Sequence, residues 1–242
     1  MARSLAPVAL LLLAGSLVLL WFVILSGLTR TSPLRQTYFL RADTSGIEGA
    51  RPISQWTFFR VCGLDNLDCG PSRPALPLGD AWASFADNVP DELIGDFGND
   101  TTSYSYWYMW RFGWVFYLLA LFFEVVAFVV GLLALCSRIG SMLAGLVTMI
   151  ALVFLSVGAS LMTATFVKMR NAFRAEGRDA SIGSYAFGFS WGAVAALLLA
   201  TILFCASRHK SRSPPPAPGS HIPRRSYPWS RRTNRHVKSD YA

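Results

Sequence analysis

The sequence predicts an all-α membrane protein, in which a four-helix transmembrane bundle carries a small disulfide-braced extracellular loop containing β-structure. Three observations support this class. The 242 residues are 53% hydrophobic and only 15% charged, whereas soluble domains carry about 25% charged residues. The apolar residues gather in four stretches of 22–26 residues, and the long loop after the first stretch holds two cysteines. This composition excludes a soluble enzyme and a nucleic-acid-binding protein.

The four apolar stretches are residues 5–28, 112–136, 142–167 and 185–206. A helix rises about 1.5 Å per residue and the bilayer core is about 30 Å thick, so even the shortest stretch spans it. The connecting segments are a long loop, a turn, a short loop and a C-terminal tail: residues 29–111, 137–141, 168–184 and 207–242. A signal peptide is the alternative for the first stretch, but its apolar region is typically only about 7–15 residues long.

Four spans place both chain ends and the turn on one face of the membrane, and the two loops on the other. Basic residues near the span ends are balanced, seven against eight, so the positive-inside rule alone does not decide. Asn99 begins the glycosylation sequon Asn-Asp-Thr, which is used only on the luminal side. With the loop cysteines and the remaining basic residues of the tail, this sequon predicts cytoplasmic termini and extracellular loops.

Cys62 and Cys69 lie in the long loop, where an oxidising environment lets them pair. Closing so small a loop stabilises the fold by roughly 2–3 kcal/mol on the chain-entropy account. Residues 36–41 and 56–61 are rich in β-forming residues and are bounded by Gly and Pro, which predicts a small sheet beside these cysteines. Cys136 and Cys205 end the second and fourth spans, where S-palmitoylation or plain helix-end packing are the alternatives.

Glu124 is the only charged residue within the four stretches, at the midpoint of the second. A charge there costs about 2.5–3.5 kcal/mol, so we expect a protonated or hydrogen-bonded carboxyl. Its candidate partners are hydroxyls of the later spans: Ser156, Ser160, Thr163 and Ser190. A packing role and a proton- or cation-sensitive site are the two interpretations.

Small residues follow one face of the fourth span, led by Gly188 and Gly192. Such a ridge favours close helix packing or homotypic association. Aromatic residues from Tyr104 to Trp114 crowd the start of the second span and predict an anchor at the outer membrane interface.

The tail carries the whole net charge of +8. It is rich in Pro and Ser, so we expect it to lack a folded core. Basic segments beside a membrane bind anionic inner-leaflet lipids with about 1 kcal/mol per residue; a merely solubilising tail is the alternative. The residues expected to contact lipid are Arg208, Lys210, Arg212, Arg224, Arg225, Arg231 and Arg232.

Catalysis is not expected. All three histidines fall in the tail, and the sequence has neither a phosphate-binding glycine loop nor a Cys-x-x-Cys pair. Nucleophilic sites and His-based metal sites therefore lack their usual residues. We expect no enzyme activity, no cofactor and no metal site.

Two segments of the long loop carry a family resemblance. Residues 39–47, FLRADTSGI with Asp43 at the centre, precede residues 56–63, WTFFRVCG, which run from Trp56 to Gly63; Cys69 follows. This arrangement resembles the fungal Sur-seven/PalI family over residues 5–207. The Trp–Cys–Cys pattern is also similar to the first loop of claudins, although the claudin Gly-Leu-Trp context is absent, so that likeness concerns architecture only.

The resemblance implies a plasma-membrane tetraspan of eisosome-associated cortical compartments, which organises membrane domains and influences endocytosis, the cell wall and the stress response. The expected partners are anionic lipids and either further copies or other cortical membrane proteins, with no nucleic acid. The alternatives are a sensor or signalling subunit of the ambient-pH type, and a channel or transporter component that uses Glu124.

Overall fold

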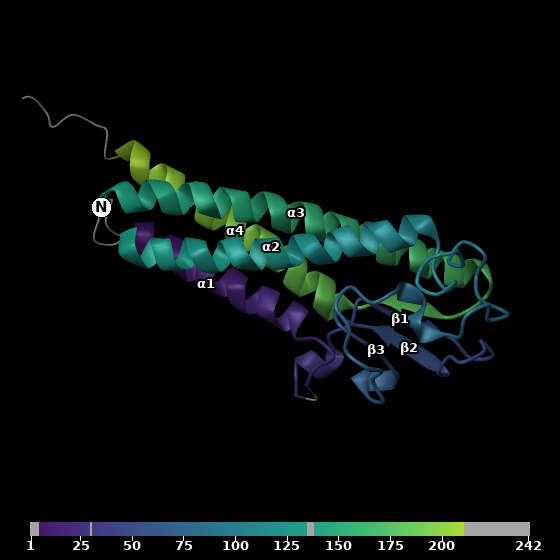
Figure 1. Ribbon diagram of the computed structural model, residues 1–242. Helices are drawn as coiled ribbons and strands as arrows, with labels where there is room; N and C mark the ends of the chain where they lie inside the picture. Colours follow the sequence, from purple (N-terminus) through teal and green to yellow (C-terminus); the bar gives the residue numbers. More distant parts are fainter. Residues whose placement is uncertain (1–4, 30, 135–137, 211–242) are drawn as a thin grey trace, which may run out of the picture. The chain divides into compact units, whose positions relative to one another are not determined.

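The computed structural model describes residues 5–29, 31–134 and 138–210. The chain divides into two units, Met1–Ser211 and Arg212–Ala242, and the second lies outside the described residues. In the first unit, long helices run side by side and a small sheet lies at one end of them (Figure 1). Among the described residues, four helices are long and apolar enough to cross a membrane, which confirms the predicted fold class.

The four long helices are α1 (Leu5–Ile24), α2 (Tyr104–Ala134), α3 (Arg138–Ala175) and α4 (Ser184–Lys210). The most extensive helix contacts join α2 to α3 and α1 to α4. Small side chains line these contacts and are fully buried, which lets the helix axes approach closely. They are Ala120, Ala127, Ala144, Ala151, Ala159, Ala186, Ala193 and Ala200.

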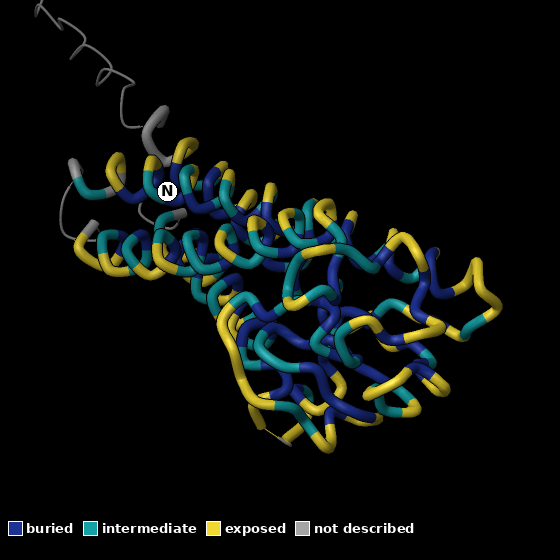
Figure 2. Tube along the Cα trace, turned by 45° about the vertical axis from the view of Figure 1, so that its right-hand side comes forward, coloured by how far each residue is buried: buried dark blue, intermediate teal, exposed yellow. Residues whose placement is uncertain are grey.

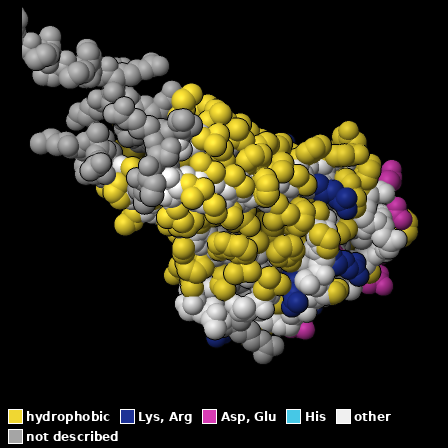
Figure 3. Space-filling view, turned by 60° about the vertical axis from the view of Figure 1, so that its left-hand side comes forward, with side chains coloured by type: hydrophobic (Ala, Val, Ile, Leu, Met, Phe, Trp, Pro, Cys, Tyr) yellow, Lys and Arg dark blue, Asp and Glu magenta, His cyan; other side chains and the backbone are white. Residues whose placement is uncertain are grey.

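The buried residues face the inside of the bundle, and the exposed residues face outward (Figure 2). Those exposed residues are largely apolar, and on the face shown in Figure 3 hydrophobic side chains cover the helices while charged side chains gather near the sheet. An apolar outer surface of this extent is typical of helices that face lipid.

Helices α2 and α3 are longer than the spans that they contain. With 31 and 38 residues they measure about 46 and 57 Å, against a bilayer core of about 30 Å. Relative to the predicted spans, α2 begins earlier, at Tyr104, and α3 continues to Ala175. Both extensions point toward the sheet, so α2 and α3 form a stalk beneath it.

Helix α3 ends in a glycine turn. Gly177 has φ +76° and its N–H donates to the carbonyl of Arg174, while the N–H of Arg178 donates to the carbonyl of Phe173. A left-handed residue just past a helix end is the usual way to satisfy the last carbonyls. The chain is thereby turned back toward the sheet.

The sheet has four antiparallel strands in the order β3-β2-β1-β4: β1 is Leu40–Asp43, β2 Ile53–Trp56, β3 Val61–Cys62 and β4 Ala180–Ile182. On β1, Leu40 and Ala42 are buried and Arg41 is exposed, as expected of a strand with one face on a core. The loop between α3 and α4 contributes β4, which pairs Leu40 with Ile182. The sheet therefore joins both loops.

The strands differ from the predicted β-runs. Leu34–Gln36 is a 3-10 helix that follows Pro33, so β1 begins only at Leu40. After β2, Thr57 closes a turn in which its N–H and its Oγ1 both donate to the carbonyl of Arg60. Residues 57–60 therefore form a tight hairpin turn between β2 and β3. The β-run predicted at residues 56–61 covers this turn, with one strand residue at each end.

An aromatic cluster joins the sheet to the stalk. Phe39 stacks on Phe166 of α3 at 5.1 Å and meets Trp110 of α2 edge-on at 6.2 Å. Trp110 is 1% exposed and its Nε1 donates to the carbonyl of Leu76 at 2.7 Å. The predicted aromatic anchor of α2 is thus divided: Tyr104 and Tyr108 are exposed, whereas Trp110 belongs to the core.

Candidate functional site

The best-defined candidate site is the sheet module, by which we mean residues 31–103 and 176–183. Trp56 stands at its centre on β2 and is 1% exposed. Its Nε1 donates to the carbonyl of Leu78 at 2.8 Å, and its ring contacts those of Trp82 and Phe173. The predicted loop tryptophan therefore connects the sheet, the loop that follows it and helix α3.

The predicted disulfide is confirmed between Cys62 and Cys69. It closes the turn that contains Leu64–Asn66, where Asp65 and Asn66 both adopt positive φ. Positive φ is uncommon outside glycine, and Asn and Asp tolerate it best. The covalent link thus holds a turn that would otherwise have several backbone alternatives.

Asn66 anchors this disulfide loop to distant parts of the module. Its Nδ2 donates to the carbonyls of Leu34 and Thr37 at 3.1 and 2.9 Å, and its N–H donates to the Gln55 side chain at 2.9 Å. Asn66 is 4% exposed. Through Asn66 the disulfide loop therefore also fixes the segment before β1.

Arg178 joins the second loop to the first. Its guanidinium donates to the carbonyl of Ser45 at 2.8 Å and to that of Asn88 at 3.0 Å. These contacts and the β1–β4 pairing hold residues that are 90 or more positions apart in the sequence. The sheet module is therefore one connected body.

Asp43 and Gly63, the other two residues of the predicted loop motif, have local roles. The Asp43 carboxylate accepts the N–H of Ser45 at 2.9 Å, and these Ser45 hydrogen bonds lower the pKa of Asp43 below its usual value. The N–H of Gly63 donates to the carbonyl of Leu67, and a Cβ at Gly63 would lie 3.2 Å from that oxygen. Both residues shape turns rather than present reactive groups.

Asn99 of the predicted sequon is exposed at the edge of the module. Its Nδ2 donates to the Ser84 hydroxyl at 2.6 Å. Its backbone φ is +67°, in a turn that places Thr101 in the interior. Glycosylation of Asn99 stays a prediction.

Glu124 is fully buried in the bundle, and neither carboxyl oxygen has a hydrogen-bond partner among the described residues. The proposed hydroxyl partners are engaged elsewhere: Ser160 and Thr163 bond to their own helix, and Ser190 receives the Tyr117 hydroxyl at 2.7 Å. The Ser16 hydroxyl of α1 lies close to the Glu124 carboxyl and donates to the carbonyl of Ala193.

The two glycines of α4 lie in different surroundings. A Cβ at Gly192 would contact Leu19 of α1 at 3.4 Å, whereas a Cβ at Gly188 would meet nothing within 4 Å. Gly188 is on the outward face of α4, beside the exposed Tyr185 and Trp191. Intramolecular packing on α4 instead uses Ala186, Ala193 and Ala200, which are fully buried.

The remaining predicted residues lie near or beyond the limits of the described chain. Cys205 is an exposed free cysteine on α4. Arg208 and Lys210 belong to the last turns of that helix. Outside the described residues lie Cys136, Arg212, Arg224, Arg225, Arg231 and Arg232. Palmitoylation and lipid contact of the tail stay predictions.

Asn66 and Arg178 were not singled out from the sequence. For Asn66 a signal was present, since an Asn between two cysteines at a turn is favoured at positive φ. For Arg178 none was available, because its acceptors are backbone carbonyls of a different loop. Chemically, the module offers buried hydrogen bonds and aromatic packing, and within residues 5–29, 31–134 and 138–210 there is no group of three His, Cys, Asp or Glu side chains able to hold a metal.

Comparison with known proteins places these features in a wider group. A sequence profile described as the SUR7/PalI family matches residues 5–203. The chain is 39% identical over 201 residues to Protein SUR7 of Candida albicans, covering 81% of this chain and 72% of that protein. It is 34% identical over 211 residues to the SUR7 family protein FMP45 of Saccharomyces cerevisiae, covering 84% and 66%.

A third relative from Saccharomyces cerevisiae is named an uncharacterized plasma membrane protein, YNL194C. The chain is 30% identical to it over 201 residues, covering 80% of this chain and 64% of that protein. The chain thus spans about two thirds of the length of these relatives, and the matched part contains the sheet module and most of the four long helices.

Proposed function

The chain belongs to the SUR7/PalI family, and from this membership we propose that it is a non-enzymatic plasma-membrane tetraspan that organises cortical membrane domains of the eisosome type. In this role it influences endocytosis, the cell wall and the stress response. The name of one relative as a plasma membrane protein supports the location. Both chain ends face the cytosol, and the sheet module faces the wall.

One observation carries this proposal beyond family membership: the sheet module is built for rigidity. A disulfide, buried polar contacts of Trp56 and Asn66, and strands from both loops tie it to the stalk of α2 and α3. Fixed bodies suit proteins that hold positions relative to neighbours, because binding then costs little conformational entropy. In this role the module is an outer platform rather than a flexible sensor.

Lateral association is expected through the outward face of α4 around Gly188. Space within 4 Å of the missing Cβ lets a neighbouring helix approach closely. Gly15 of α1 offers a matched control, because it is also an exposed helical glycine with nothing within 4 Å. Substitution at either position leaves the interior of the bundle unchanged.

The decisive experiment follows tagged protein in living fungal cells by fluorescence recovery after photobleaching. Wild-type protein should form immobile cortical patches. Gly188→Leu should become mobile, whereas Gly15→Leu should stay in patches. Uniform, freely diffusing wild-type protein would overturn the proposal, and identical patches in both variants would remove Gly188 from the association surface.

A sensor or signalling subunit is the second candidate, favoured by the concentration of the net charge of +8 in one tail. Such a tail recruits an acidic cytosolic partner or anionic lipid. Removal of the tail, residues 207–242, should then abolish downstream signalling and leave the patches intact. Normal signalling after this truncation would rule the sensor out, and loss of patches would assign the tail to membrane organisation.

A further inference from the structure

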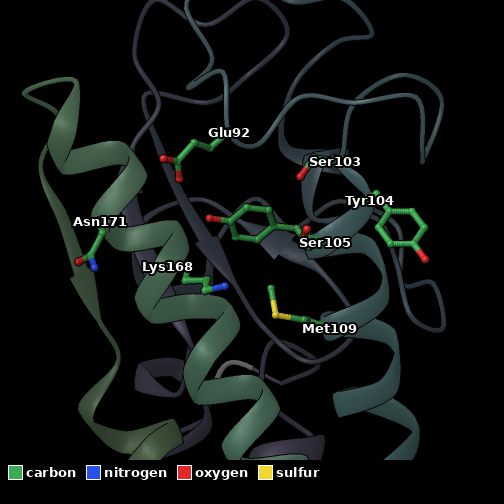
Figure 4. A pocket seen from close by; sticks show the side chains of 8 residues that line it. Glu92, Ser103, Tyr104, Ser105, Met109, Lys168 and Asn171 are labelled. Atoms are coloured by element: carbon green, nitrogen blue, oxygen red, sulfur yellow. The ribbon is translucent and has the colours of Figure 1, made fainter.

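A pocket of about 630 Å³ opens where α2 begins, facing the last turns of α3. Figure 4 shows Glu92 on the loop side of this space, Lys168 on α3, and Ser103 and Ser105 at the start of α2. The Lys168 side chain is directed from α3 toward α2. The pocket thus collects both signs of charge and several hydroxyls.

The two charged groups of this pocket are unpaired. Among the described residues, all ion pairs are formed by other side chains. Within the same part of the chain, neither the Glu92 nor the Lys168 side chain forms a hydrogen bond. An acid and a base that line one cavity without meeting leave room for a ligand between them. Such a ligand has to satisfy a cation at one end and an anion at the other.

The first turn of α2 adds donors beside Lys168. The N–H groups of Tyr104, Ser105 and Tyr106 have no acceptor in the described chain. The first N–H of α2 to donate a backbone hydrogen bond is that of Trp107, to the carbonyl of Ser103. Free N–H groups and the positive end of the helix dipole attract phosphate. With the Lys168 ammonium nearby, this end of the pocket suits an anionic group.

By the predicted span limits, the pocket lies just outside the apolar stretches, where lipid headgroups are expected. Lys168 comes directly after the third apolar stretch, which ends at residue 167, and the second stretch begins at residue 112. Beside the pocket an exposed aromatic row descends along α2 into that stretch: Tyr104, Tyr108 and Phe112, with ring centroids 4.6 and 6.2 Å apart. Its first ring, Tyr104, points away from Lys168 (Figure 4). Exposed rings in such a row give acyl chains a surface to pack on.

We propose that this pocket binds the zwitterionic headgroup of a phospholipid from the leaflet beside the sheet module. Lys168 and the N-terminus of α2 hold the phosphate, Glu92 holds the ammonium group, and the acyl chains follow the aromatic row. This inference concerns the sheet side of the protein and is independent of the proposed role in cortical domains.

The charge arrangement distinguishes zwitterionic lipids from other phosphates. An anionic lipid brings phosphate to Lys168 but leaves Glu92 without a partner, and the two negative charges repel each other. Inorganic phosphate matches the helix end but neither Glu92 nor the aromatic row. Selectivity for phosphatidylcholine or phosphatidylethanolamine over phosphatidylglycerol is therefore the distinguishing property.

The test uses the purified full-length protein and native mass spectrometry, with phosphatidylcholine, phosphatidylethanolamine, phosphatidylglycerol and inorganic phosphate as separate probes. Lys168→Met should weaken binding of all three lipids about tenfold or more, since a charge-assisted contact contributes about 1.5–3 kcal/mol. Glu92→Gln should weaken the two zwitterionic lipids selectively and thereby remove the preference over phosphatidylglycerol.

The controls are Arg41→Met and Glu48→Gln, which remove the same charges from exposed positions outside the pocket. Both should bind lipid as the wild type does, and all four variants should keep the wild-type thermal midpoint because the substituted side chains are exposed. Equal lipid binding by Lys168→Met and wild type overturns the proposal. Binding of inorganic phosphate as tight as that of the lipids also overturns it. An unchanged preference of Glu92→Gln for zwitterionic lipids over phosphatidylglycerol overturns it as well.

Discussion

At the scale of single residues, the sheet module depends on a few buried donors that reach backbone carbonyls. Nε1 of Trp56 and Nδ2 of Asn66 donate hydrogen bonds to backbone carbonyls that lie outside the strands. A net hydrogen bond contributes about 1 kcal/mol, but a buried group left without its partner costs about 1–3 kcal/mol. Losing one partner is therefore more damaging than the bond alone indicates.

Trp56→Phe tests this asymmetry. Phenylalanine keeps an aromatic ring on β2 but leaves the buried carbonyl of Leu78 without its donor, so we expect a loss of about 1–3 kcal/mol in stability. Denaturant unfolding of the purified protein, followed by fluorescence, measures it. Trp21→Phe is the control, since Trp21 is exposed on α1; equal midpoints for both variants would show that the Trp56 bond contributes nothing.

Asp43 makes the folding stability of the sheet module depend on pH. Hydrogen bonds from Ser45 favour the ionised carboxylate and hold the pKa of Asp43 below its usual value. A depressed pKa stabilises the fold above the unfolded pKa of about 3.8, and this contribution disappears as pH falls through the lower folded pKa. Thermal midpoints of wild type and Asp43→Ala should differ at pH 7, and the difference should shrink as pH falls below the unfolded pKa of Asp43; a constant difference contradicts the assignment.

At the scale of elements, α2 and α3 each contribute both to the membrane-spanning bundle and to the stalk. Their middle parts are spans, and their ends form the stalk, where buried side chains recur at helical spacing: Met169, Ala172 and Phe173 on α3. Between stalk and sheet, β4 leads into α4 through Gly183, whose N–H donates to the carbonyl of Phe39. This junction couples the fourth helix to the edge of the sheet.

Gly183→Ala tests the junction. A Cβ at Gly183 would overlap the backbone carbonyl of Tyr38, and backbone moves less readily than a flexible side chain. We expect a loss of about 1–3 kcal/mol, as for other overpacked positions, measured by thermal unfolding in detergent. Gly188→Ala, five residues later and open on its outer side, should leave the midpoint unchanged or raise it slightly; equal destabilisation would contradict the steric account.

At the scale of the whole molecule, the bundle holds its helices by small residues and a few hydroxyl contacts. The Tyr117 hydroxyl on α2 bonds to Ser190 on α4, and Ser16 on α1 bonds to the carbonyl of Ala193. Glu124 lies in the same interior, and its carboxyl has no hydrogen bond to another residue of the described part of the chain. Since an unpaired charge in the bilayer centre is costly, the folded bundle favours a neutral carboxyl.

Glu124→Gln keeps the shape of this side chain and makes it permanently neutral. We expect stability within about 1 kcal/mol of wild type, because the buried group is already uncharged, as measured by denaturant unfolding in detergent at pH 7. The exposed Glu48→Gln serves as the control. A loss of several kcal/mol, specific to Glu124→Gln, would show that the ionised carboxylate is part of the native bundle.

The sequence alone determined the features that depend on local composition. A long apolar run predicts a membrane span whatever its position in the chain. Two cysteines seven positions apart are close in any folded loop, and the net charge of the tail follows from counting its charged residues. These properties predicted the fold class and the disulfide. They also led to the residues of the sheet module, through the Trp–Cys–Cys pattern.

Only the tertiary structure decided which distant residues meet. β4 joins β1 across most of the chain, Trp110 turns inward to Leu76, and Glu92 and Lys168 face one pocket from separate elements. Apolar runs specify that helices form but not which faces touch, because nearly every side of such a helix is hydrophobic. The choice between core and lipid therefore rests on small residues, turns and buried hydrogen bonds that act together only in the folded protein.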